Sequence, residues 1–108
     1  MIHVQIMYQE QSIQTIAIRG HAFAGDPGFD LVCAGVSAIG TGMLNALDRL
    51  FPDLVDLTLI DDHDPLIRVE IKQSNESLQL VLQAFITQLE TIQVSYADAI
   101  HISRRNNQ

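Results

Sequence analysis

The chain has 108 residues, of which 47% are hydrophobic and 18% are charged. These fractions are typical of a folded globular protein and exclude a disordered chain, and the length suits one domain over residues 1–108. The net charge is −7, whereas nucleic-acid binding usually needs a basic patch, so we expect no direct binding of RNA or DNA. An acidic surface of this kind tolerates a basic polypeptide partner.

Three features indicate a cytoplasmic protein that does not contact a membrane. The first ten residues, MIHVQIMYQE, lack the basic start of a signal peptide and alternate as a strand does. No apolar run approaches the roughly 20 residues that are needed to span a bilayer. The only cysteine, Cys33, excludes an internal disulfide, which fits a reducing compartment and leaves one thiol to be explained.

The first half of the chain predicts a hairpin followed by a helix. Apolar residues alternate with polar ones over residues 2–8 and 13–19, which is the pattern of half-buried strands. A glycine- and proline-containing loop over residues 20–29 follows. From Asp30 the apolar spacing changes to three and four, which predicts an amphipathic helix that ends near Phe51.

The second half repeats this pattern of elements and adds a last strand. Alternation predicts strands over residues 55–59 and 67–71, joined by an acidic turn. Ser74 or Asn75 could cap a second helix, and residues 99–103 are expected to form the last strand before a frayed tail. The predicted fold is α+β, a mixed five-stranded sheet with two helices in the order strand-strand-helix-strand-strand-helix-strand.

Three glycines lie inside the first predicted helix. Gly35, Gly40 and Gly42 each cost roughly 1 kcal/mol relative to alanine in a helix interior. We therefore expect another backbone, from the sheet or from a second subunit, to approach this helix closely.

The position of Cys33 allows two interpretations. With Asp30 as N-cap, Cys33 is the third helical residue, where the helix dipole favours a thiolate and free amides could stabilise an oxyanion. A helix that starts at Pro27 instead places Cys33 two turns in and removes this argument. A lone cysteine is also often a small buried hydrophobe.

His21 follows the second strand and precedes Cys33 by twelve residues, so the loop could bring a base to the thiol. It could also be a solvated loop residue. Other chemistries fit less well: Ile39 stands where a cysteine phosphatase needs arginine, and a thioredoxin-type centre needs a second cysteine. The turn over residues 61–64 lacks the spaced oxygens and glycine of a calcium loop, so we expect no metal and no other cofactor.

Two motifs stand out: Gly20-His21-Ala22 and, after the loop, the stretch DLVCAGVSA over residues 30–38. Together they resemble the motifs of the ribosomal-processing cysteine protease family Prp. The resemblance implies a cytoplasmic, homodimeric cysteine endopeptidase, a hydrolase that acts in bacterial ribosome biogenesis. It would remove a short N-terminal extension from a large-subunit ribosomal protein.

The resemblance also implies roles for single residues. His21 and Cys33 match the catalytic pair of the family, and Asp30 and Ser37 match residues for which we expect supporting roles. Gly35 departs from the family, which usually has alanine there. Apart from the resemblance, Phe23 and Phe29 flank the site and could line a substrate groove or only pin the loop.

Two other functions fit the same residues. One is a non-catalytic dimeric adaptor that binds a basic peptide of a ribosomal protein at a sheet edge. The other is an acyl-transferring enzyme that uses the same cysteine and histidine on a different carbonyl.

Overall fold

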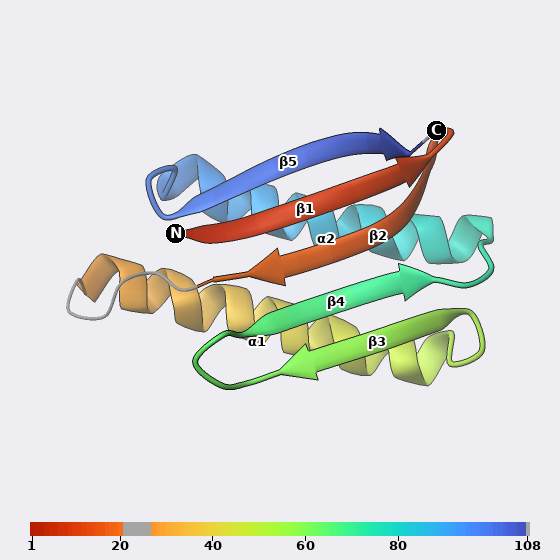
Figure 1. Cartoon of the computed structure of the whole chain (residues 1–108), viewed down its shortest axis with the longest axis horizontal. Helices are drawn as coiled ribbons and strands as arrows, with labels where there is room; N and C mark the ends of the chain where they lie inside the picture. Colours follow the sequence, from red (N-terminus) through yellow and green to blue (C-terminus); the bar gives the residue numbers. More distant parts are fainter. Residues whose placement is uncertain (21–26, 108) are drawn as a thin grey trace.

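The fold is described here from a computed structural model, which places residues 1–20 and 27–107, with the side chains described for residues 1–20 and 31–107 (Figure 1). The elements follow the predicted order, and their bounds are β1 Ile2–Gln9, β2 Ser12–Arg19, α1 Pro27–Leu50, β3 Val55–Ile60, β4 Leu66–Ile71, α2 Glu76–Ser95 and β5 Ile100–Asn107. This sequence of elements confirms the α+β prediction.

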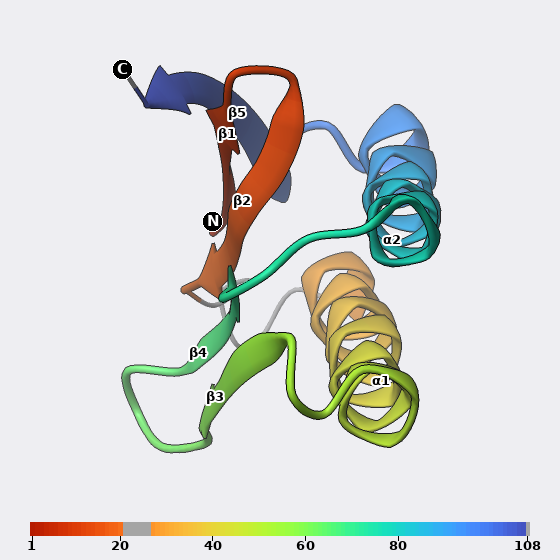
Figure 2. The same cartoon turned by 90° about the vertical axis from the view of Figure 1, so that its right-hand side faces the viewer.

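The strands form one mixed sheet in the order β3-β4-β2-β1-β5. β1 is antiparallel to β2 and parallel to β5, and β4 is antiparallel to both β2 and β3. Both helices lie on the same face of this sheet, so the molecule has two layers and the other sheet face is open (Figure 2). The order of the elements alone allows helices on one face of the sheet or on both, and the structure has the first arrangement.

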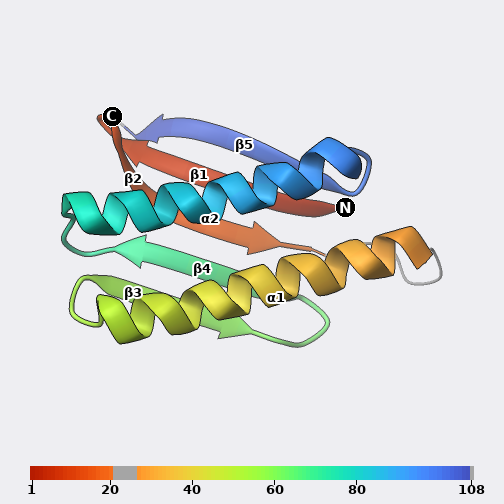
Figure 3. The same cartoon turned by 180° about the vertical axis from the view of Figure 1, so that it is seen from behind.

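Alternation along the strands builds the core between the two layers. In β1, Ile2, Val4 and Ile6 are buried while His3 and Gln5 are exposed on the open face. α1 lies over β3 and β4, and α2 lies over β2 and β5 (Figure 3). No polar or charged side chain is buried among the residues that the structure describes, so apolar burial dominates the free energy of folding.

The second helix has Asn75, one of the two predicted candidates, as its N-cap. The Asn75 side chain accepts a hydrogen bond from the Leu78 amide at 2.8 Å, which satisfies one amide of the first turn. One turn on, the Gln79 side chain accepts from the Ile13 amide at 2.8 Å and donates to the Ile13 carbonyl at 2.9 Å. α2 is therefore tied by polar contacts to β2 as well as by its apolar face.

The predicted frayed tail is wrong for residues 104–107. These residues continue β5, because Arg104 to Asn107 pair in register with Ile6 to Gln9 of β1. Arg104 also donates to the Glu90 carboxylate of α2 at 2.7 Å. The polar composition suggested a solvated tail, but the backbone hydrogen bonds of the ladder do not require apolar side chains.

The predicted helix start at Asp30 is also wrong. α1 begins at Pro27, which makes Asp30 the fourth helical residue and not the N-cap. Proline suits the first helical position because its fixed φ is already helical and its missing amide proton has no intrahelical partner there.

Within α1, the segment Leu31–Leu50 is long and apolar enough to cross a membrane by length and composition alone, with a mean hydropathy of 1.4. The prediction from sequence that no such segment exists considers only uninterrupted apolar runs. Asn45 and Asp48 interrupt the apolar run within this helix. Val32 and Val36 of this segment are buried in the core, as in the core helix of a folded domain.

The helical glycines differ in what surrounds them. A Cβ at Gly40 would lie 2.6 Å from Cδ1 of Ile67 in β4, so this glycine does permit close approach of α1 to the sheet. A Cβ at Gly35 would make an ordinary 3.7 Å contact with Ile92 of α2, and one at Gly42 would meet nothing within 4 Å. Within this chain the close neighbour at Gly40 is a side chain and not the predicted backbone, and no close neighbour lies at the other two positions, whereas approach of a second subunit stays a prediction.

Alanine substitutions of these glycines test this difference. We expect Gly35→Ala and Gly42→Ala each to raise the free energy of unfolding by about 0.5–1 kcal/mol through helix propensity. Gly40→Ala should remain below both, because Ile67 must move and overpacking costs about 1–3 kcal/mol. Urea unfolding of the three variants measures the order, and a Gly40→Ala variant more stable than the other two would contradict it.

Candidate active site

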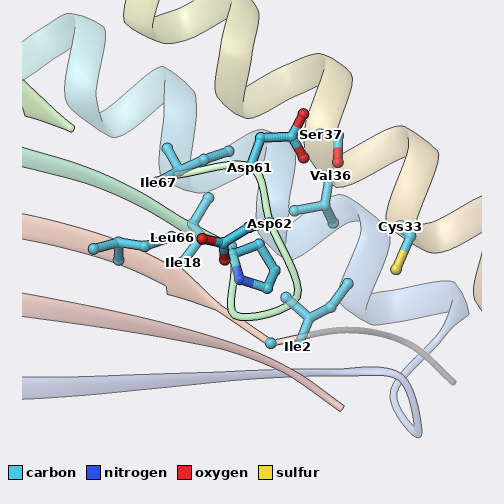
Figure 4. A pocket seen from close by; sticks show the side chains of 11 residues that line it. Ile2, Ile18, Cys33, Val36, Ser37, Asp61, Asp62, Leu66 and Ile67 are labelled. Carbon is cyan, nitrogen blue, oxygen red and sulfur yellow. The ribbon is translucent and has the colours of Figure 1, made fainter. Parts of the chain in front are cut away.

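A pocket lies where the start of α1 passes the ends of the central strands (Figure 4). It is lined from three sides, by α1, by the ends of β1 and β2, and by the β3–β4 turn with the start of β4. The lining includes Cys33 and Ser37 from α1, Ile2 and Gly20 from the strand ends, and Asp61 and Asp62 from the turn. The pocket therefore combines one thiol, one hydroxyl and two carboxylates over an apolar floor.

Gly20 is the first residue of the Gly20-His21-Ala22 motif, and backbone geometry requires a glycine there. Its φ is +90°, and a Cβ would lie 2.5 Å from the carbonyl oxygen of Met1. β2 can therefore end beside the start of β1 only with glycine at this position. Because Gly20 lines the pocket, the chain leaves β2 at the pocket wall just before His21 in the sequence.

Cys33 is half-buried, and its sulfur points from α1 toward the strand ends (Figure 4). It is the seventh residue of α1 when counted from Pro27, so its amide lies beyond the four free amides of a helix start. The expected help from the helix dipole and from first-turn amides at Cys33 is therefore wrong. The interpretation as a fully buried hydrophobe is wrong as well, because Cys33 faces the pocket.

Ser37 lies one helical turn after Cys33 and lines the same pocket, so the structure brings these two predicted residues together. Asp30 and Phe29 lie in the first turns of α1, but their side chains are outside the described residues. His21 and Phe23 also lie outside them. Their expected roles stay predictions.

The sequence reasoning missed Asp61 and Asp62 as residues of the site. It treated the turn as solvated, and both side chains are indeed exposed, yet both line the Cys33 pocket. The local sequence holds no signal for this, since their place depends on β4 pairing with β2. Among the described residues, no group of three histidine, cysteine or acidic side chains could hold a metal ion.

Comparison with known proteins identifies the family. The family described as Cysteine protease Prp matches residues 1–101 of this chain. The chain belongs to this family. It is therefore a cysteine protease, and Cys33, its only cysteine, lines the pocket described above.

Individual relatives agree over nearly the whole length. The ribosomal processing cysteine protease Prp of Staphylococcus aureus is 31% identical over 95% of this chain and 98% of its own. That of Bacillus subtilis is 32% identical over 87% of this chain and 88% of its own. A crystal structure of the S. aureus protease with a covalently linked product peptide covers 96% of this chain and 99% of that chain, with 33% identity and a TM-score of 0.79.

The Gly20→Ala variant tests whether the pocket depends on this backbone geometry. We expect a loss of stability of about 1–3 kcal/mol, because alanine disfavours this φ and the Met1 carbonyl blocks its Cβ. The melting temperature should then fall by roughly 5–15 °C. Gly42→Ala is the matched control in thermal unfolding, because a Cβ at Gly42 meets nothing within 4 Å. An unchanged melting temperature for Gly20→Ala would contradict the requirement for glycine at position 20.

Proposed function

We propose that this protease removes the short N-terminal extension of a large-subunit ribosomal protein during bacterial ribosome assembly. The observation that carries the proposal is the single pocket that joins Cys33 to Gly20, the residue before His21. The S. aureus relative is a ribosomal processing protease, and its structure has been solved with a substrate peptide. A peptide is therefore the substrate class that this pocket suits best.

The proposed mechanism uses Cys33 as nucleophile and His21 as base. His21 takes the proton of the Cys33 thiol, and the thiolate attacks the carbonyl carbon of the scissile peptide bond. The tetrahedral adduct collapses as the C–N bond breaks and His21 gives its proton to the leaving amine. A water molecule, deprotonated by His21, then attacks the thioester and releases the new carboxyl end and the thiol.

Other residues support these steps in the proposal. Ser37 lines the pocket one turn from Cys33, where its hydroxyl can donate a hydrogen bond to bound peptide. Asp30 retains a supporting role by its match to the family motif, although not as an N-cap. Phe23 and Phe29 are proposed to contact the substrate.

The cellular setting is proposed as well. Ribosome assembly implies a cytoplasmic enzyme without membrane contact, and the net charge of −7 suits a basic ribosomal protein better than RNA. We propose a homodimer; exposed Leu31 and Leu50 on α1 offer apolar surface for one. Sedimentation velocity measures the oligomeric state directly.

Substitution of the catalytic pair tests the proposed function. The unmodified protein should shorten the ribosomal protein at its N-terminus, as detected by mass spectrometry. Cys33→Ala and His21→Ala should each lower the rate by roughly 10³-fold or more, because neither nucleophile nor base can be replaced by solvent. Intact substrate after incubation with the unmodified protein would contradict the proposal.

The adaptor function would give a different result with the same variants. An adaptor would bind the extension equally well before and after Cys33→Ala and would release no shorter product. The acyl-transferring alternative would leave a product with an added acyl acceptor, which differs from the hydrolysis product in mass.

A further inference from the structure

The Cys33 pocket has an apolar floor and an acidic rim. Ile2, Ile18 and Ile67 line it from β1, β2 and β4, while Asp61 and Asp62 line it from the β3–β4 turn. Among the described residues that line the pocket, none is basic. The pocket is therefore negatively charged at the place where a peptide must lie to reach the thiol.

Both carboxylates are available to a ligand. Two basic residues of β4 and its end pair elsewhere: Arg68 with Glu70 at 3.1 Å and Lys72 with Asp56 at 4.0 Å. Arg19, at the end of β2, lies opposite Leu66 at the start of β4 and forms no ion pair with Asp61 or Asp62. Within the part of the chain that the structure describes, neither aspartate is therefore neutralised by an ion pair.

The turn holds the two aspartates in different ways. Oδ1 of Asp62 accepts a hydrogen bond from the Asp64 amide at 2.8 Å, which fixes that carboxylate within the turn. The Asp61 carboxylate points from the turn toward α1 at Ser37 (Figure 4). Asp61 thus faces the helix that carries the thiol, and Asp62 adds charge beside it.

We propose that Asp61 and Asp62 select a lysine or arginine side chain of the substrate close to the scissile bond. These side chains have a long apolar stem and a charged end, so the stem can lie on the isoleucines while the end meets the carboxylates. The inference rests on the proposed function, because it names the substrate chemistry that the same pocket recognises. It assigns both aspartates as specificity-determining residues.

Peptide cleavage by the full-length enzyme tests this selection. The peptides span the cleavage site near the N-terminus of the ribosomal protein. Each pair of peptides carries lysine or norleucine at one position, and the pairs together cover three positions on each side of the scissile bond. Norleucine keeps the apolar stem and removes the charge. At one position at least, we expect kcat/KM to favour lysine about 5- to 20-fold at low salt, and less at high salt because the carboxylates are exposed.

Three variants locate the source of the preference. Asp61→Asn and Asp62→Asn, singly and together, should lower the lysine-to-norleucine ratio, with the double variant near one. In Asp62→Asn the side-chain carbonyl oxygen can still accept the hydrogen bond from the Asp64 amide, so the turn keeps its conformation. Asp64→Asn is the matched control, since Asp64 lies in the same turn but does not line the pocket, and it should keep the ratio of the unmodified enzyme.

The outcomes separate this inference from the proposed function. If the enzyme cleaves both peptide sets equally at every position, or if the double variant keeps the preference, the selection is overturned while the protease function stands. If Asp64→Asn abolishes the preference as strongly as the double variant, net charge and not the pocket is responsible, and the inference is also overturned. If no peptide is cleaved, the proposed function fails and the inference fails with it.

Discussion

The close contact between α1 and the sheet at Gly40 is the constraint on which the site depends. Gly40 has no side chain, and a Cβ built there would lie only 2.6 Å from Cδ1 of Ile67. Cys33 lies seven residues earlier, two turns along and on the same side of the helix. Ile67 also forms part of the pocket floor. Packing at Gly40, together with buried Val36 and Leu44, therefore holds the helix that carries the thiol close to the strand that supplies part of the pocket floor.

Local sequence patterns were sufficient for the order and type of the elements but not for their junctions. The alternation predicts β1 and the capping signal narrows the start of α2 to Ser74 or Asn75, because these signals depend on neighbouring residues only. The helix start was wrong because the apolar spacing reports which residues face the core, whereas Pro27 reports where the backbone turns helical. The predicted end of β5 was wrong because the residues that pair with β5 lie in β1, about 98 residues away in the sequence.

The site shows the same limit in its chemistry. The two motifs were found from sequence, and the structure places Gly20 and Cys33 at one pocket. Cys33 does not lie in the first turn of α1, so the proposed reactivity of its thiol depends on other groups of the site. Asp61 could not have been assigned, because the turn reaches the pocket only through the sheet order β3-β4-β2. Asp61 and Asp62, which no motif contains, join the site through the pairing of residues that lie far apart in the chain.

The parallel pairing of β1 with β5 also governs when the pocket can form. The Ile2 amide donates to the Ala99 carbonyl at 2.9 Å, so one wall of the pocket is anchored by residues near the end of the chain. During synthesis the first strand is made long before its outer neighbour, and contacts of such high sequence separation form late in folding. A newly made chain therefore carries its thiol before it has a complete pocket. For an enzyme that cuts other polypeptides, this order of assembly delays activity until β5 of its own chain has been translated.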